Sequence, residues 1–185
     1  MTFSLERIRQ SSFRRFGVLF ADVTQLDDLR DHFSEPEMRA FLRRLADQFR
    51  ITLRPTDTMA WSPERSMFLT LIEDIPTPEA PLKIAGRIRD SMKRFLETND
   101  RGLGLRASVG VLLCDAEYGE IGQILEDIEL ARLQLRAGLY TNPSIFDREM
   151  LAAVEGRPAR PGRLKVGVAM VVPKLIAYQI LEPAL

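Results

Sequence analysis

The sequence contains a single cysteine, Cys114, and a single histidine, His32, and this scarcity excludes several kinds of site. One cysteine cannot form an internal disulfide, and we expect Cys114 to be a small buried residue rather than a nucleophile. We expect His32 on the polar side of a helix, where no second histidine or cysteine accompanies it to hold a metal. A reducing compartment suits this cysteine usage, so we expect a cytoplasmic location.

The chain also lacks a charge excess and a long apolar run. Lys plus Arg and Asp plus Glu both number 26, so no overall basic field favours nucleic acid as a partner. Charges or prolines interrupt every apolar run, and we expect no membrane insertion by this chain. A glycine-rich phosphate loop, a nucleophile elbow and a CxxC pair are absent too. An anionic ligand would therefore have to be held by a local cluster of side chains.

What is present predicts a mixed fold. With 185 residues, 45% of them hydrophobic, the chain can bury the core of an ordinary domain. Apolar runs predict strands, and apolar residues at helical spacing predict helices. The predicted strands are 16–21, 58–61, 66–72 and 105–113, and the predicted helices are 26–33, 36–53, 84–95 and 121–136. This order, βααββαβα, indicates an α/β (α+β) sandwich whose antiparallel-rich central sheet is flanked by helices.

The C-terminal part of the sequence is less regular. We expect a helix over Asp147–Val154, a linker over Pro158–Gly162 and a strand over Val166–Val172. The sequence thus divides into residues 1–140, which carry the pattern above, and a C-terminal extension, residues 141–185, of unknown role.

Four segments carry a family resemblance: FGVLFADVTQL, RPTDTMAWSPERSMFLTLIED, IAGRIRDSM and LRASVGVLL. In this order and spacing they resemble the GGDEF domain of diguanylate cyclases, over roughly residues 14–140. The resemblance implies a nucleotidyl-cyclase-like palm fold and a role in cyclic di-GMP signalling.

In that family, as the resemblance implies, two facing domains align two GTP molecules for metal-assisted attack of a 3′-hydroxyl on the α-phosphate. Two carboxylates hold the cations, because hard divalent metals need oxygen ligands. The first position matches Asp22, and the second is the third letter of the signature, which here is Arg65. A permanent cation there repels the metal in addition to removing a ligand. The five signature positions are Pro63, Glu64, Arg65, Ser66 and Met67.

Other departures from the family pattern indicate the same loss. The paired glycines that let the nucleotide approach are Pro63 and Glu64, whose side chains would fill that space. The guanine-contacting Asn falls on Arg30, although Asp31 is kept. The later Gly-Asp pair falls on Met38-Arg39, and the phosphate-stabilising Lys falls on or near Gln134. We therefore expect a degenerate domain with no catalytic residues, no bound metal and no cofactor.

Asp22 has two interpretations. An Asp at the end of a strand with Thr24 beside it is favoured as a helix cap or turn former. The alternative is that it still holds a cation or a nucleotide weakly.

A second family site is better preserved. Many of these cyclases bind their product at an RxxD motif a fixed distance before the signature, and Arg54 and Asp57 have that spacing. Arg87 matches a further arginine on the following helix. Arginine offers a planar fork to guanine or phosphate, and Asp accepts from the guanine N–H donors. The alternative is an ordinary solvated pair or cap.

The leading hypothesis is a catalytically inactive signalling module that binds cyclic di-GMP through Arg54, Asp57 and Arg87 and relays it to a protein partner or neighbouring domain. One alternative is a ligand-independent interaction or dimerisation scaffold, in which a homodimer is possible. Another is an enzyme with residual nucleotide chemistry that uses Asp22.

Overall fold

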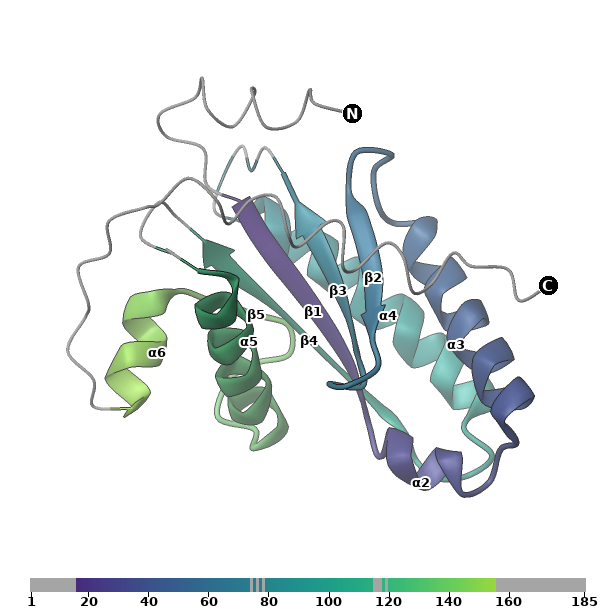
Figure 1. The fold of residues 1–185 in the computed structure, drawn as a ribbon. Coiled ribbons are helices and arrows are strands. Elements are labelled where there is room, and N and C mark those ends of the chain that lie inside the picture. The colour runs from purple at the N-terminus through teal and green to yellow at the C-terminus, as the bar shows by residue number, and fades with distance from the viewer. Residues whose placement is uncertain are drawn as a thin grey trace.

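The computed structural model describes residues 16–155 except 74, 76, 78, 115–117 and 119. Its elements follow one another along the chain as Figure 1 shows. They are β1 (Phe16–Thr24), α2 (Leu26–Arg30), α3 (Glu35–Arg50), β2 (Thr58–Ser62), β3 (Met67–Ile72), α4 (Ala80–Asn99), β4 (Arg106–Cys114), α5 (Ile121–Arg136), β5 (Ser144–Phe146) and α6 (Arg148–Glu155). The predicted order of strands and helices is confirmed, although α2 is shorter than expected and β1 continues through Asp22.

A single sheet with the strand order β2-β3-β1-β4-β5 forms the centre of the molecule. Strand β1 pairs antiparallel with both β3 and β4, and β2 pairs antiparallel with β3. Only the β4–β5 pair is parallel among the described strands. The antiparallel-rich sheet is therefore confirmed.

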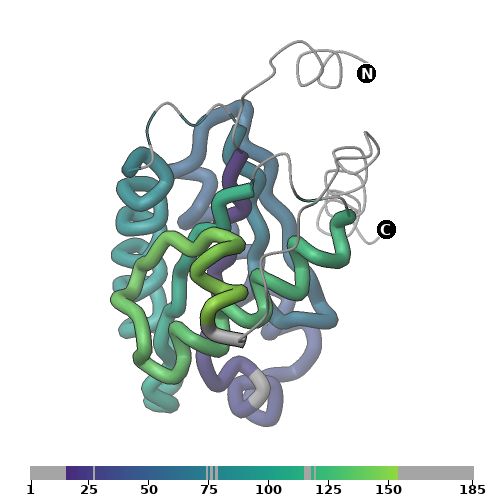
Figure 2. The backbone as a smooth tube through the Cα atoms, turned by 90° about the vertical axis from the view of Figure 1, so that its left-hand side faces the viewer, coloured from purple at the N-terminus to yellow at the C-terminus, as the bar shows by residue number. Residues whose placement is uncertain are grey.

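The two faces of the sheet are covered by different helices, as the edge-on view in Figure 2 shows. Because side chains alternate along a strand, Leu19, Ala21 and Val23 of β1 pack beneath α3 and α4. Val18 and Phe20 face the other way, toward α5 and α6. Asp22 shares the side of Phe20, so its carboxylate is on the α5 side of the sheet.

Close packing on the α5 side requires a glycine in β4. A Cβ atom at Gly110 would lie 2.3 Å from Phe20 Cζ and 3.0 Å from Leu135 Cδ1. The Phe20 ring therefore occupies the space that a side chain at position 110 would need. This explains why the predicted strand 105–113 contains a glycine.

The chain beyond residue 140 adds elements to this body. The predicted helix over Asp147–Val154 is present as α6, whereas β5 was not predicted because a three-residue strand has no pattern to detect. Asn142 positions β5, since its side-chain amide accepts from Val109 N at 3.0 Å and donates to Ala107 O at 2.7 Å. The expected linker Pro158–Gly162 and strand Val166–Val172 lie outside the described residues. The division of the chain into residues 1–140 and a C-terminal extension, 141–185, stays a prediction.

The connection between α2 and α3 is fixed by charge. The Glu37 carboxylate accepts from the Ser34 hydroxyl at 2.7 Å and from the Ser34 N–H at 2.8 Å. These bonds, together with the Arg101 guanidinium, lower the pKa of Glu37 from 4.5 to about 2. Arg101 also donates to the His32 carbonyl at 2.7 Å, so the loop that contains His32 is held against the start of α3.

Two expectations about single residues are decided here. Cys114 is completely buried at the end of β4, as predicted. His32 is exposed, but it lies in the turn after α2 and not on a helix as expected, and its Nδ1 atom lies 2.8 Å from the Asp28 carbonyl. Within the described part of the chain, none of the helices combines the length and the apolar character that crossing a membrane requires.

Candidate functional site

The signature residues form the turn between β2 and β3. Pro63 and Glu64 are exposed, Arg65 and Ser66 are half-buried, and Met67 already belongs to β3 with no exposed surface. Ser66 adopts a positive φ of 51° and donates its N–H to the Pro63 carbonyl at 3.3 Å. Since Met67 lies directly across from Asp22 in the sheet, this turn sits beside the Asp22 carboxylate.

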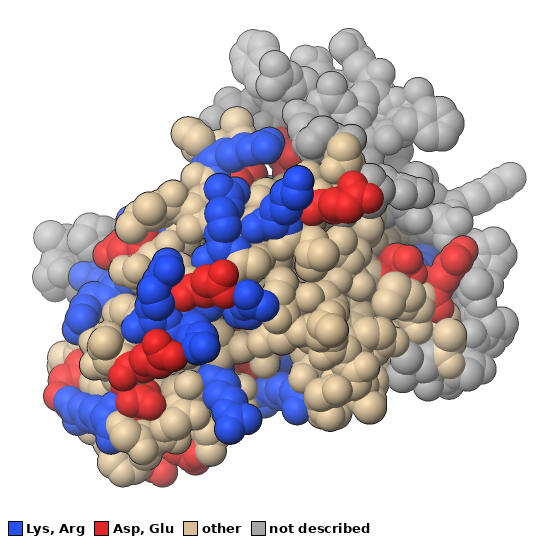
Figure 3. Space-filling view, turned by 180° about the vertical axis from the view of Figure 1, so that it is seen from behind, with Lys and Arg blue, Asp and Glu red and all other residues tan. Residues whose placement is uncertain are grey.

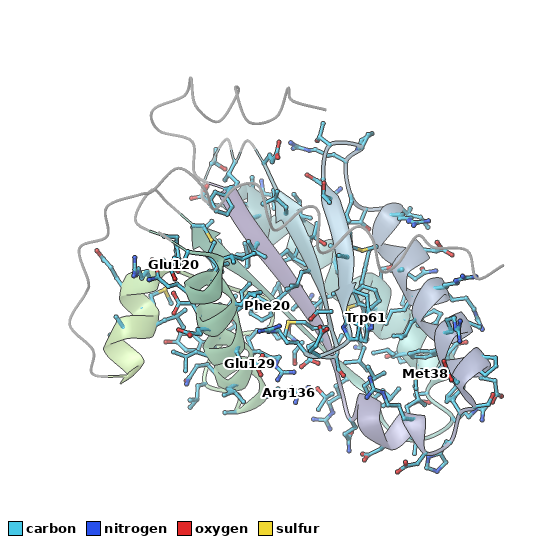
Figure 4. All side chains as sticks on the ribbon, viewed as in Figure 1. Phe20, Met38, Trp61, Glu120, Glu129 and Arg136 are labelled. Atoms are coloured by element: carbon cyan, nitrogen blue, oxygen red, sulfur yellow. The ribbon has the colours of Figure 1, made fainter. Side chains whose placement is uncertain are left out.

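Asp22 is completely buried and bound to arginine. The Nε and Nη2 atoms of Arg136 donate to its two carboxylate oxygens at 2.6 and 2.8 Å. Arg136 is the last residue of α5, and Figure 4 shows it at the end of that helix nearest the β2–β3 turn. The interpretation of Asp22 as a helix cap is wrong, because β1 continues past it and Gln25 precedes α2 without any side-chain cap.

A second arginine links α5 to the turn. Arg132 lies one helical turn before Arg136, on the same face of the helix. Its Nη1 atom donates to the Arg65 carbonyl at 3.1 Å and lies 3.9 Å from an Asp22 oxygen. Its Nη2 atom is paired with Glu129 of the same helix. The Arg132 guanidinium thus stands between two carboxylates and the main chain of the turn.

A third arginine reaches the turn from α2. Arg30 donates from Nη2 to the Ser66 hydroxyl at 3.2 Å, so α2 and α5 both contact the signature turn. Together with Arg65 of the turn itself, four arginines border this place. The carboxylates beside them are Asp22, Glu129 and Glu64, so the surroundings of the turn carry an excess of positive charge.

The RxxD motif lies at the other end of the sheet. Figure 1 shows the loop between α3 and β2 at the same end as the start of α4, opposite the β2–β3 turn. The Asp57 carboxylate accepts from the Arg54 N–H at 2.8 Å, and the Asp57 N–H donates to the Arg54 carbonyl at 3.0 Å. These two bonds close a tight turn, so Asp57 caps its own motif through Oδ2.

The two guanidinium groups assigned to this site are exposed. Arg54 projects from the turn, and Arg87 lies about two turns into α4. Among the described residues neither group has an ion pair or a hydrogen bond, so no such bond joins Arg87 to the turn. Figure 3 shows the face covered by α3 and α4, where Lys and Arg side chains gather in a band interleaved with acidic residues.

Comparison with protein families places the chain. The family described as "Diguanylate cyclase, GGDEF domain" matches residues 2–138. The chain belongs to the GGDEF family. This confirms the resemblance found in the sequence and relates the chain to proteins of cyclic di-GMP signalling, whereas no curated protein matches it.

Solved GGDEF structures share the fold at low sequence identity. The GGDEF domain of TpbB (YfiN) from Pseudomonas aeruginosa has a TM-score of 0.62 at 18% identity, covering 83% of this chain and 88% of that one. The diguanylate cyclase SiaD from the same organism, in complex with its activator SiaC, has a TM-score of 0.58 at 19% identity, with coverages of 77% and 53%. The GGDEF domain of DgcB from Caulobacter crescentus, in complex with c-di-GMP, has a TM-score of 0.53 at 12% identity, with coverages of 71% and 78%.

A divalent cation of the kind that the GGDEF family implies does not fit the residues at the turn. Both oxygens of Asp22 already accept hydrogen bonds from Arg136. The second carboxylate position is Arg65, and no group of three or more His, Cys, Asp or Glu side chains among the described residues could hold a metal. A site bordered by guanidinium groups suits an anion rather than a cation.

Sequence reasoning missed the residues that define this GGDEF turn. Arg132, Arg136 and Glu129 all lie on the predicted helix 121–136, but only Gln134 was considered there. The signal available was a pair of arginines four residues apart near the end of an amphipathic helix. Their partners, Asp22 and the Arg65 carbonyl, are 114 and 67 residues away in sequence, so no local pattern connects them.

Proposed function

We propose that this chain is a GGDEF domain that does not synthesise cyclic di-GMP but binds it through Arg54, Asp57 and Arg87. Binding is then relayed to a protein partner or a neighbouring domain. The observation that carries the proposal is the contrast between the two ends of the sheet. At the signature turn the Asp22 carboxylate is already neutralised by arginine. At the other end of the sheet, the exposed guanidinium groups of Arg54 and Arg87 make no ion pair or hydrogen bond with the part of the chain that the structure describes.

Loss of synthesis is supported by the charge at the turn. Phosphoryl transfer between nucleotides depends on cations that offset the phosphate charge. Here Asp22 is engaged by Arg136, and the second ligand position is an arginine. Removing such electrostatic stabilisation costs orders of magnitude in rate.

We expect the purified protein to form no cyclic di-GMP from GTP with Mg²⁺ or Mn²⁺, because Arg136 engages Asp22 and an arginine stands at the second ligand position. The measurement is chromatography of the nucleotides after prolonged incubation at micromolar protein. The control is the double variant Asp22→Asn, Arg136→Gln, which removes the carboxylate and its partner charge together. Turnover by the wild type above that control would overturn the proposal and support the enzymatic alternative.

Ligand binding is supported by the geometry of the RxxD turn. Asp57 uses Oδ2 to close the turn, so Oδ1 stays available to accept from the N–H groups of a guanine. The turn is thus ordered before a ligand arrives, which lowers the entropy that binding must cost. Arg54 and Arg87 lose no hydrogen bond or ion pair to a described residue when they turn toward guanine or phosphate.

Calorimetric titration with cyclic di-GMP tests this directly. We expect measurable binding by the wild type and a loss of roughly 10- to 100-fold for Arg54→Ala, since a charged hydrogen-bond donor is removed. Arg43→Ala is the matched control, because Arg43 is also an exposed arginine, on α3, and its loss changes the net charge equally. It should bind as the wild type does.

Two results would contradict the binding site. One is an absence of heat with the wild type at high micromolar ligand. The other is equal weakening by Arg54→Ala and Arg43→Ala, which would mean that only the overall charge matters. The double variant Arg54→Ala, Asp57→Ala, in which the turn loses its cap as well, should abolish binding.

A second candidate function is the ligand-independent scaffold. The observation in its favour is exposed apolar surface at the end of α5, where the Leu133 and Leu139 side chains are 52% and 67% exposed. SiaD in complex with its activator is an example of a GGDEF protein that engages a protein. In a scaffold, the Arg54 and Asp57 substitutions should leave partner binding or self-association unchanged, whereas Leu133→Ser should weaken it.

A further inference from the structure

The buried carboxylate of Asp22 has a counter-charge that belongs to the chain itself. Arg136 presents two parallel N–H donors, one to each oxygen, in the bidentate geometry that guanidinium and carboxylate groups favour. A carboxylate with no exposed surface needs such a partner, because burial of an unpaired charge is strongly unfavourable. Among the described residues, α5 alone supplies positive groups to this carboxylate.

A second carboxylate faces the same guanidinium groups. Arg132 is paired through Nη2 with Glu129 and lies 3.9 Å from Asp22 through Nη1. One oxygen of Glu129 and the Nε atom of Arg132 are buried with no hydrogen-bond partner. Asp22 and Glu129 are thus two carboxylates held on either side of one arginine, an arrangement that would attract a cation if the arginines were absent.

We propose that Arg132 and Arg136 act as a built-in replacement for a divalent cation between Asp22 and Glu129. A cation that approached Asp22 would meet both guanidinium groups and would have to displace the bidentate bonds of Arg136. Coulomb repulsion at these distances is strong in a partly buried site. The wild-type site is therefore closed to metal ions, and the two arginines keep its charge balanced at all times. This inference does not depend on cyclic di-GMP binding.

The replacement also fixes the signature turn. A bound metal ion dissociates, whereas the Arg132 guanidinium is part of α5 and donates to the Arg65 carbonyl at 3.1 Å. The helix, β1 and the β2–β3 turn are therefore joined without any ligand. The proposed role is electrostatic, so a neutral glutamine at both positions, which keeps the first part of each aliphatic stem, should reopen the site without removing most of the packing.

The test is Mn²⁺ binding, measured from the free Mn²⁺ signal in electron paramagnetic resonance. The wild type should bind no more Mn²⁺ than its Asp22→Asn variant. The double variant Arg132→Gln, Arg136→Gln should bind one Mn²⁺ roughly tenfold more tightly or better, since two repelling charges are gone. Adding Asp22→Asn to that double variant should remove the gained site.

The matched control is Arg39→Gln, Arg50→Gln. It removes the same two positive charges from exposed ion pairs on α3. The proposal would be overturned if this control bound Mn²⁺ as tightly as the Arg132→Gln, Arg136→Gln variant does. It would also be overturned if the wild type bound Mn²⁺ at a site that Asp22→Asn removes. If the Arg132→Gln, Arg136→Gln variant is unfolded in metal-free buffer, recovery of its circular dichroism on addition of Mn²⁺ supports the proposal, and failure to recover contradicts it.

Discussion

An alanine at Gly110 is expected to destabilise the domain by about 1–3 kcal/mol, and a valine to prevent folding, because β4 has no room for a side chain there. The added Cβ would lie 2.3 and 2.8 Å from two carbons of the Phe20 ring and 3.0 Å from Leu135. Phe20 is completely buried in the central strand and contacts Phe146 of β5, so the ring cannot swing into solvent. Equilibrium urea denaturation measures the loss in the free energy of unfolding.

The control for Gly110→Ala is Gly122→Ala on α5. A Cβ atom at Gly122 meets nothing within 4 Å, and alanine favours a helix, so this variant should be neutral or more stable by about 0.4–1 kcal/mol. Phe20→Leu should restore part of the stability of Gly110→Ala, because it removes the atoms that collide. Equal stabilities for Gly110→Ala and Gly122→Ala would contradict this prediction, because they would show that the Phe20 ring can move aside without a loss of stability.

The parts of the fold that sequence reasoning reached are those with a repeating pattern. The apolar run 16–21 predicted a strand, and β1 is the central strand between β3 and β4. The apolar positions of the second predicted helix, among them Met38, Phe41 and Leu45, are its buried face. Each of these features follows from a periodicity that a single element carries by itself.

The missed parts depend on how distant elements meet. Alternation along β1 shows that Asp22 shares a face with Phe20, but no pattern says which helix covers that face or where the helix ends. Only the docked position of α5 brings Arg136 within 2.6 Å of the carboxylate. Strand β5 is similar, because three residues gain their conformation from pairing with β4 and from the Asn142 side chain.

The RxxD turn shows how one residue can satisfy both interpretations of a motif. The sequence allowed two alternative roles for Asp57, a cap of its own turn or part of a ligand site. The structure shows the cap, with Oδ2 bonded to the Arg54 N–H. The cap leaves the second Asp57 oxygen available, and no described residue holds either guanidinium group in an ion pair or hydrogen bond. A role in ligand binding therefore stays a prediction that the cap supports rather than excludes.

The other large effect is expected at Asp22. Replacement by alanine should destabilise the protein by about 3–5 kcal/mol, since it leaves Arg136 and Arg132 beside a buried apolar space without their carboxylate. The lower end of this range is expected, because the Arg136 side chain is 34% exposed and water can solvate part of the freed charge. Urea denaturation followed by circular dichroism measures the change in the free energy of unfolding.

A double-mutant cycle separates the ion pair from simple loss of packing. Asp22→Asn alone and Arg136→Gln alone each leave one charge without its partner, whereas the double variant leaves neither. The double variant should therefore lose less free energy of unfolding than the two single variants lose in sum. The coupling free energy between Asp22 and Arg136 should exceed that of the exposed Glu35–Arg39 pair on α3. For exposed pairs of this kind about 0.2–1 kcal/mol is typical. A coupling no larger than that of Glu35–Arg39 would mean that Arg136 does not carry the charge of Asp22, and the replacement of a metal ion by arginine would be untenable.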